Sequence, residues 1–194
     1  MIDGTSHATI ADLKYLAREG AINFYSLYRC HNYHFKTYGA MFLGQYGPAL
    51  EAAEQMAASI SEDLLRVESP PMADWLEAFV SIKLHVYIRF GKWPEIIAAP
   101  LPADRELYSV TTAMLHYAKA VAYAASFNVP SAEKEARLFE EALARVPESR
   151  CLFNNTSLDI LAVAAEMMKG EIEYRKFNFE KAFAHLRKSV ELYD

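Results

Sequence analysis

Apolar residues recur along most of the chain at intervals of three and four, which is the period of one face of an α-helix. This pattern predicts helices that include residues 46–64, 72–90, 110–124, 132–143, 158–172 and 179–193. No segment of comparable length alternates with a period of two, so we expect no sheet. The sequence therefore predicts an all-α fold whose helical content is far above that of an average domain.

Turn-forming residues separate the helical runs. Prolines or helix-capping side chains stand at 69–71, 128–131, 147 and 156. Thr156 precedes Asp159 by three residues, which is the spacing of an N-terminal helix cap. Residues 98–105 contain two prolines, and we expect an irregular loop there. The other connections are short, so neighbouring helices should pack antiparallel as hairpins.

One arrangement of residues recurs at the turns. Gly44 follows a helical run, with an aromatic residue two positions later and Ala49 five positions later, and Gly91 and Phe177 begin the same arrangement. A glycine permits the backbone conformation that ends a helix, and a small residue lets two helices approach closely. Positions equivalent to Ala49 recur at intervals of 47, 36 and 50 residues, at Ile96, Ala132 and Ala182.

These hairpins resemble the tetratricopeptide repeat family, whose unit has a small residue in each helix and an aromatic residue after the turn. The last unit fits best, with Gly170 and Ala182 at the two small positions. The resemblance implies a helical-hairpin solenoid, an α-α superhelix with irregular repeats. It also implies one helical domain over residues 1–194 that is part of a longer array, with a concave groove for a protein or peptide.

A closer resemblance rests on the run His31-Asn32-Tyr33-His34-Phe35. Together with residues 89–93 and 116–119, this run resembles a group of bacterial and fungal tetratricopeptide proteins of unassigned function. The similarity covers roughly residues 13–194, and members of the group look longer at both ends. The resemblance implies no activity and no cofactor.

Charge and composition exclude some classes of partner. A formal net charge of -5 supplies no excess of cations for a nucleic acid backbone or an anionic membrane surface. We find no secretory signal and no apolar run long enough to span a membrane. The two cysteines, Cys30 and Cys151, are expected to be reduced thiols. These features favour a cytoplasmic protein that binds neither nucleic acid nor membrane.

Histidines supply the candidate site. His31 and His34 stand three residues apart and so share one helical face, beside Tyr38, while His116 interrupts the most apolar helix of the chain. We expect His31 or His34 to lie near His116 or another polar side chain, in a pocket between helices that binds a ligand. A weaker alternative is a metal site formed by His31, His34 and His116, for which Cys30 or His85 could also supply a donor. The alternative without a functional site is that these histidines form hydrogen bonds in a groove between helices.

A protein-interaction scaffold is the favoured function, because no complete catalytic set is visible. A Cys30 thiolate activated by a histidine is chemically allowed, but a cysteine on an aromatic-rich helix is more often part of the core. The alternative function is an enzyme, or a binder of metal or small molecules, centred on the histidines. The last helix leaves Phe183, Leu186 and Val190 without a further polar helix, so we expect self-association there.

Overall fold

The computed structural model describes residues 2–20, 22, 23 and 25–193, with side chains from residue 7 onward. Helices account for 74% of the chain, which confirms the all-α fold class. The chain divides into two compact units, Met1–Phe90 and Gly91–Asp194.

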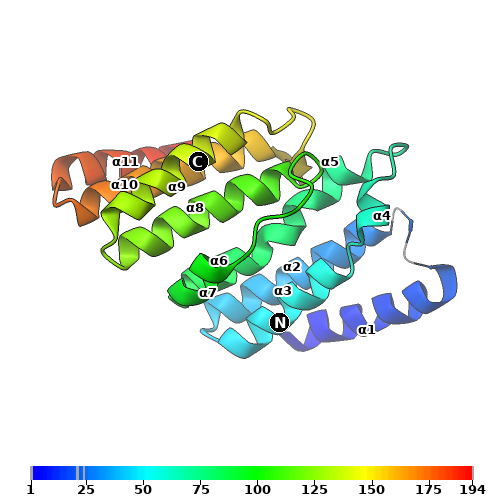
Figure 1. Ribbon diagram of the computed structural model, residues 1–194. Coiled ribbons are helices and arrows are strands. Elements are labelled where there is room, and N and C mark those ends of the chain that lie inside the picture. The colour runs from blue at the N-terminus through cyan, green and yellow to red at the C-terminus, as the bar shows by residue number, and fades with distance from the viewer. Residues whose placement is uncertain (1, 21, 24, 194) are drawn as a thin grey trace. The chain divides into compact units, whose positions relative to one another are not determined.

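The first unit is built around the antiparallel hairpin of α2 and α3 (Figure 1). Helix α1 packs along α2, and α6 packs against α3 and α2. The elements of this unit are α1 (Ile2–Glu19), α2 (Ser26–Phe42), α3 (Tyr46–Ala58), α4 (Glu62–Leu65), α5 (Met72–Leu76), the 3-10 helix η1 (Glu77–Ser81) and α6 (Ile82–Arg89).

Helix α1, which the periodicity did not predict, is joined to α2 by a buried carboxylate. Asp12 accepts hydrogen bonds from the Tyr25 hydroxyl at 2.8 Å and from Asn32 Nδ2 at 2.9 Å. The rings of Tyr15 and Tyr25 lie 4.3 Å apart. Asn32, the second residue of the histidine run, therefore has a structural role: it holds α1 against α2.

The single helix predicted over residues 72–90 is divided in the structure. Helices α5 and α6 are separated by the tighter η1 segment, where the Ser81 hydroxyl donates to the Ala78 carbonyl oxygen at 2.9 Å. A hydroxyl that bonds back to the carbonyl three residues earlier competes with the α-helical ladder. The apolar face continues through the interruption, because Leu76, Phe79 and Ile82 are all buried.

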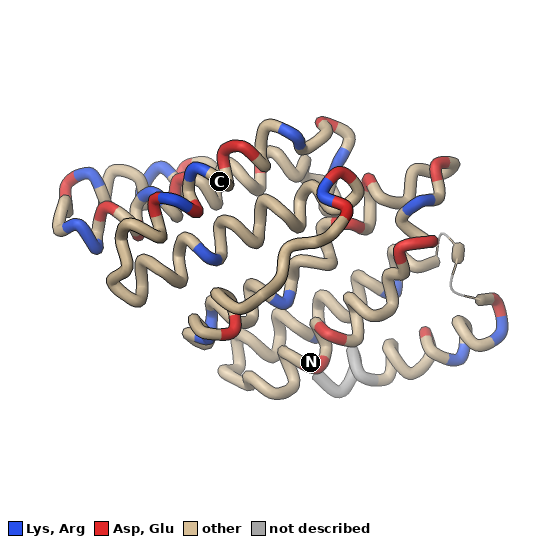
Figure 2. Tube along the Cα trace, in the orientation of Figure 1, with Lys and Arg blue, Asp and Glu red and all other residues tan. Residues whose placement is uncertain are grey.

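The second unit is a stack of two long hairpins, α8/α9 and α10/α11, with α10 also against α8 and α9 (Figure 1). Helix α8 also contacts α7 and is almost free of charged residues, as Figure 2 shows. Most of its residues are buried, so α8 is a core helix of this unit. The elements are α7 (Trp93–Ala98), α8 (Ser109–Ala125), α9 (Val129–Leu143), β1 (Cys151–Leu152), β2 (Asn155–Thr156), α10 (Ser157–Arg175) and α11 (Phe179–Tyr193).

The connections in the second unit test two expectations. Residues 99–108 form an irregular loop between α7 and α8, as the prolines predicted. The expectation of no sheet was wrong, because β1 and β2 pair antiparallel as a two-residue ladder, Cys151 with Thr156 and Leu152 with Asn155. A tight turn brings these residues together, with Phe153 at a φ of 55°. Thr156 then caps α10 as predicted, since its hydroxyl accepts the Asp159 amide at 3.1 Å.

The three long hairpins share one turn geometry. The left-handed residue Gly44 stands two positions after the end of α2, and the Gln45 amide donates to the Ala40 carbonyl at 2.9 Å. Phe127 and Phe177 take the left-handed position in the other two hairpins, with the same pattern of hydrogen bonds. The position five residues after the left-handed residue is wholly buried in each hairpin and after Gly91, at Ala49, Ile96, Ala132 and Ala182.

Gly170 and Ala182 mark the closest approach of α10 and α11. A Cβ atom on Gly170 would lie 2.7 Å from Leu186 Cγ and 3.2 Å from the Ala182 carbonyl oxygen. Atoms cannot approach so closely without displacement, so only glycine fits with these helices at this distance. The two small residues singled out in the sequence therefore have a physical reason in the packing.

Candidate functional site

The candidate residues His31, His34 and Tyr38 share one side of α2. The His34 ring lies 4.5 Å from the Tyr38 ring and 6.0 Å from Phe79 of η1, and His31 lies 4.6 Å from Phe35. All three candidates are half-buried. The structure thus brings these three together in an aromatic cluster at the contact of α2 with η1.

Burial sets the charge state of the histidines in this cluster. Desolvation lowers the pKa of His34 to about 4, with further contributions from His85 of α6 and from His31. Burial also lowers the pKa of His85 to about 4. Both imidazoles are therefore neutral at neutral pH, and they pack as polar aromatic rings rather than as cations.

His116 has a partner in its own unit. Its Nδ1 atom lies 2.7 Å from Glu135 Oε2 of α9, and the His116 side chain is buried. The predicted polar partner for this histidine therefore exists as a carboxylate. Contact of His116 with His31 or His34 would join the two units and stays a prediction.

The geometry of the described residues does not favour a metal site or a reactive Cys30 thiolate. Among the described residues, no three His, Cys, Asp or Glu side chains are grouped so that they could hold a metal ion. Cys30 is wholly buried, and desolvation raises the pKa of its thiol to about 12. A buried, protonated thiol is a poor nucleophile, so Cys30 belongs to the core of the first unit.

Helix α2 also carries an exposed feature that the sequence analysis did not recognise. Tyr28, Phe35 and Phe42 are spaced by seven residues and are 59%, 53% and 83% exposed. His31 and Tyr38 fill the positions between them, so aromatic rings follow the helix at alternating intervals of three and four residues. We call these five residues the aromatic stripe. Their spacing was readable from the sequence, but their exposure was not.

The corresponding face of α10 shows what normally covers such positions. Counted back from the left-handed turn residues Gly44 and Phe177, the positions of Tyr28 and Phe35 correspond to those of Leu161 and Met168. Both of these α10 residues are wholly buried. Arg175, seven residues after Met168 on the same face, lies over the Phe127 ring at the α8/α9 turn. The preceding hairpin therefore covers on α10 the face that α2 leaves exposed.

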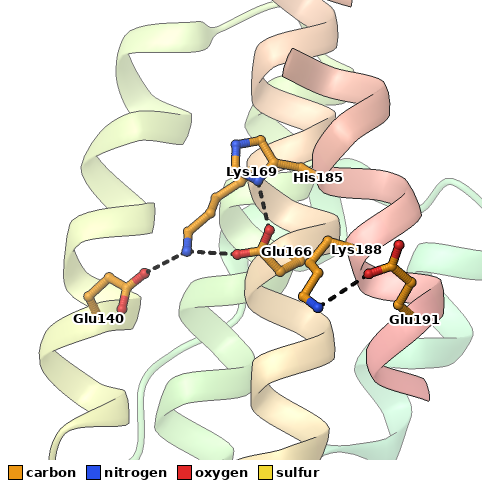
Figure 3. Close-up of polar contacts among 6 residues, drawn as sticks. All are labelled: Glu140, Glu166, Lys169, His185, Lys188 and Glu191. Carbon is orange, nitrogen blue, oxygen red and sulfur yellow. Dashed lines mark hydrogen bonds and ion pairs between the residues drawn. The ribbon is translucent and has the colours of Figure 1, made fainter. Parts of the chain in front are cut away.

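A second feature missed in the sequence is a polar chain across the outer surface of the second unit. Figure 3 shows Lys169 of α10 between Glu140 of α9 and Glu166, whose other oxygen faces His185 of α11. The ammonium lies 3.7 Å from Glu140 and 3.1 Å from Glu166. His185 Nδ1 lies 2.7 Å from Glu166 Oε2. This chain of polar contacts ties three helices together.

The acid in the middle of this chain is held ionised. Partial burial alone would raise the pKa of Glu166, but hydrogen bonds from His185 and Lys169 outweigh it and lower the pKa. The Glu166–His185 pair occupies the positions that His116 and Glu135 occupy 50 residues earlier, with acid and imidazole exchanged. The 50-residue spacing from Ala132 to Ala182 was the sequence signal that could have revealed this exchange.

Comparisons with protein-family models, with curated proteins and with solved structures give no match to this chain. None of the helices within the described residues is long and apolar enough to cross a membrane.

Proposed function

We propose that this chain is a scaffold of tetratricopeptide-like hairpins that binds another protein, and that the aromatic stripe of α2 accepts an α-helix of that partner. One observation carries the proposal. The face that is covered by helices on α10 is exposed on α2 and bears aromatic rings at Tyr28, Phe35 and Phe42. An exposed row of large apolar residues is typical of an interaction surface.

The hairpins support the repeat assignment. The left-handed turn and the buried residue five positions later recur in the hairpins, and the close approach at Gly170 involves the small residues that the tetratricopeptide pattern has in each helix. The spacing of equivalent positions is irregular, as expected for a degenerate array. A scaffold of this kind presents helix faces to partners and needs no catalytic group.

The chemistry of the stripe indicates the kind of partner. Residues at alternating intervals of three and four form the seam along which two α-helices pack. A row of aromatic rings favours an apolar helix face over a charged ligand. Acidic and basic residues are interspersed along α9, α10 and α11 (Figure 2), which supports a protein rather than a nucleic acid as partner. Both cysteines are free thiols, in keeping with a cytoplasmic place of action.

Selection from a library of displayed helical peptides on the intact chain would test the proposal. Peptides that bind the stripe should be apolar at alternating intervals of three and four. They should lose on the order of tenfold or more in affinity when Phe35→Glu places a charge in the seam. The matched control is Phe183→Glu, the same substitution at an exposed residue of α11, which should leave this binding unchanged.

Two results would contradict the proposal. One is the absence of any selected peptide whose affinity depends on Phe35. The other is equal loss of affinity in both variants, which would indicate a general effect of added charge. Circular dichroism should show that both variants keep the helical content of the parent chain.

A further inference from the structure

The outer face of the last hairpin is a second apolar surface, separate from the aromatic stripe. Phe177, Phe183 and Val190 are 71%, 44% and 61% exposed, and we call these three residues the terminal face. Phe183 and Val190 stand seven residues apart on α11, so they lie on the same side of that helix. Phe177 is the left-handed turn residue between α10 and α11.

The preceding hairpin shows what packs on the equivalent face. Residues 50 positions earlier are Phe127, Glu133 and Glu140, and helix α10 contacts all three. The Arg175 guanidinium lies 5.1 Å from the Phe127 ring centroid. Lys176 Nζ lies 3.1 Å from Glu133, and Lys169 Nζ lies 3.7 Å from Glu140. In the α8/α9 hairpin, helix α10 therefore covers the face that is equivalent to the terminal face.

The change in chemistry between the two copies specifies the occupant. Where α9 has Glu133 and Glu140, which attract the ammonium groups of α10, α11 has Phe183 and Val190. A lysine placed against these apolar side chains would be desolvated without a partner. The turn phenylalanine is kept, and its ring face still suits a guanidinium.

We propose that the terminal face binds an amphipathic α-helix of a partner protein, lying as α10 lies on α8 and α9. That helix is apolar at the two positions, seven residues apart, that Lys169 and Lys176 occupy in α10. It has an arginine immediately before the second of them, over Phe177. The charge pairs that hold α10 in place are thus replaced by apolar contacts, and orientation is retained through the cation–π contact.

This surface is independent of the α2 stripe proposed above. It lies on other helices, in the other compact unit, and its argument uses only the contacts inside Gly91–Asp194. The two proposals can therefore fail separately. Phe183→Glu probes the terminal face and Phe35→Glu probes the stripe, so each variant serves as the control for the other.

Two synthetic peptides test the occupant. The first has the α10 sequence from Ser157 to Lys176, with Gly170→Ala to favour the helix. The second carries in addition Lys169→Leu and Lys176→Leu. Fluorescence anisotropy of the labelled peptides with the intact chain gives the two affinities. We expect the leucine peptide to bind on the order of tenfold more tightly than the lysine peptide.

Three variants of the chain complete the test. Phe183→Glu should abolish binding of the leucine peptide, whereas Phe35→Glu should leave it unchanged. Phe183→Lys tests the same site with the opposite charge and should also abolish binding. Melting curves must show that the variants fold. Equal affinity of the two peptides, no binding of either, or binding indifferent to Phe183 would each overturn the proposal.

Self-association gives a different outcome. If the intact chain sediments as a dimer that Phe183→Glu converts to a monomer, the occupant is a second copy of the chain. That result would overturn the proposal that a partner protein supplies the helix. It would support the self-association expected from the exposed residues of the last helix.

Discussion

His116 Nδ1 lies 2.7 Å from Glu135 Oε2 and joins α8 to α9, and the same contact joins α10 to α11 with the residue types exchanged, from Glu166 to His185. Both pairs span 19 residues and stand at the same distances from their turn residues, Phe127 and Phe177. The two hairpins thus use one pair of positions for one kind of polar link. The distance between imidazole and carboxylate is the same whether the first or the second helix of the hairpin carries the imidazole.

Exchange of the first pair should therefore be tolerated. His116→Glu alone places two carboxylates together in a buried position and should lower the free energy of unfolding by roughly 2–4 kcal/mol. Adding Glu135→His restores an acid and an imidazole, so most of that loss should be recovered. Urea unfolding of the parent, the single variant and the double variant measures the recovery.

The exchange at Glu166 and His185 supplies the control. These side chains are more exposed than His116, so Glu166→His alone should cost less, about 1 kcal/mol. A double variant at His116 and Glu135 that is no more stable than the single variant would show that the two hairpins are not equivalent at these positions.

Gly170→Ala should destabilise the second unit although alanine favours a helix. Its Cβ would meet Leu186 Cγ at 2.7 Å, so α10 and α11 would have to move apart, at a cost of roughly 1–3 kcal/mol. Gly39→Ala in α2 is the matched control, because no atom lies within 4 Å of the added Cβ. That change should be neutral or raise the melting temperature through better helix propensity. Melting curves that rank the two variants in the opposite order would refute the close packing at Gly170.

Stability should decline between about pH 6.5 and pH 4 because of His34 and His85. Burial lowers the pKa of each from 6.5 to about 4, so the unfolded chain binds protons at a higher pH than the folded chain. Their contribution is complete above pH 6.5 and is lost as the pH falls towards 4, at roughly 3 kcal/mol per histidine. Urea midpoints at pH 7 and pH 4.5 measure the loss. His34→Gln should reduce the difference between these midpoints, and an unchanged difference would contradict the burial of a neutral imidazole.

Cys30 and Cys151 should differ in reactivity. Desolvation raises the pKa of the buried Cys30 thiol to about 12, and Cys151 is only partly buried. Alkylation of the folded chain at pH 8 should therefore modify Cys151 well before Cys30, and denaturant should make the two rates similar. Peptide mass mapping over a time course distinguishes the two sites. Rapid modification of Cys30 in the folded chain would reopen the hypothesis of a reactive thiol.

Much of the fold followed from local pattern. The period of three and four located α3, α8, α9, α10 and α11, and Thr156 was correctly predicted as a cap, because both signals depend only on neighbouring residues. The periodicity did not predict helix α1. Its attachment to α2 depends on Asp12, a polar residue that accepts hydrogen bonds from Tyr25 and Asn32. The β1–β2 ladder is too short to show a period, so no pattern could reveal it.

The candidate site was predictable only in part. Adjacency of His31, His34 and Tyr38 follows from helical spacing alone, and the structure contains it. Their neighbours Phe79 and His85, and hence the neutral charge of His34, depend on how η1 and α6 fold back onto α2. Partners that are distant in sequence leave no trace in local composition.

The sequence by itself determined the helices, their turns and the small residues that let them approach, since these depend on backbone propensity and on spacing within one or two turns of helix. Tertiary structure alone decided which apolar side chains are covered. Met168 and Phe35 hold equivalent positions in their hairpins, yet Met168 is buried and Phe35 is 53% exposed. Whether a side chain is buried depends on which other residues pack against it in the folded protein. The local sequence around the side chain does not specify those neighbours.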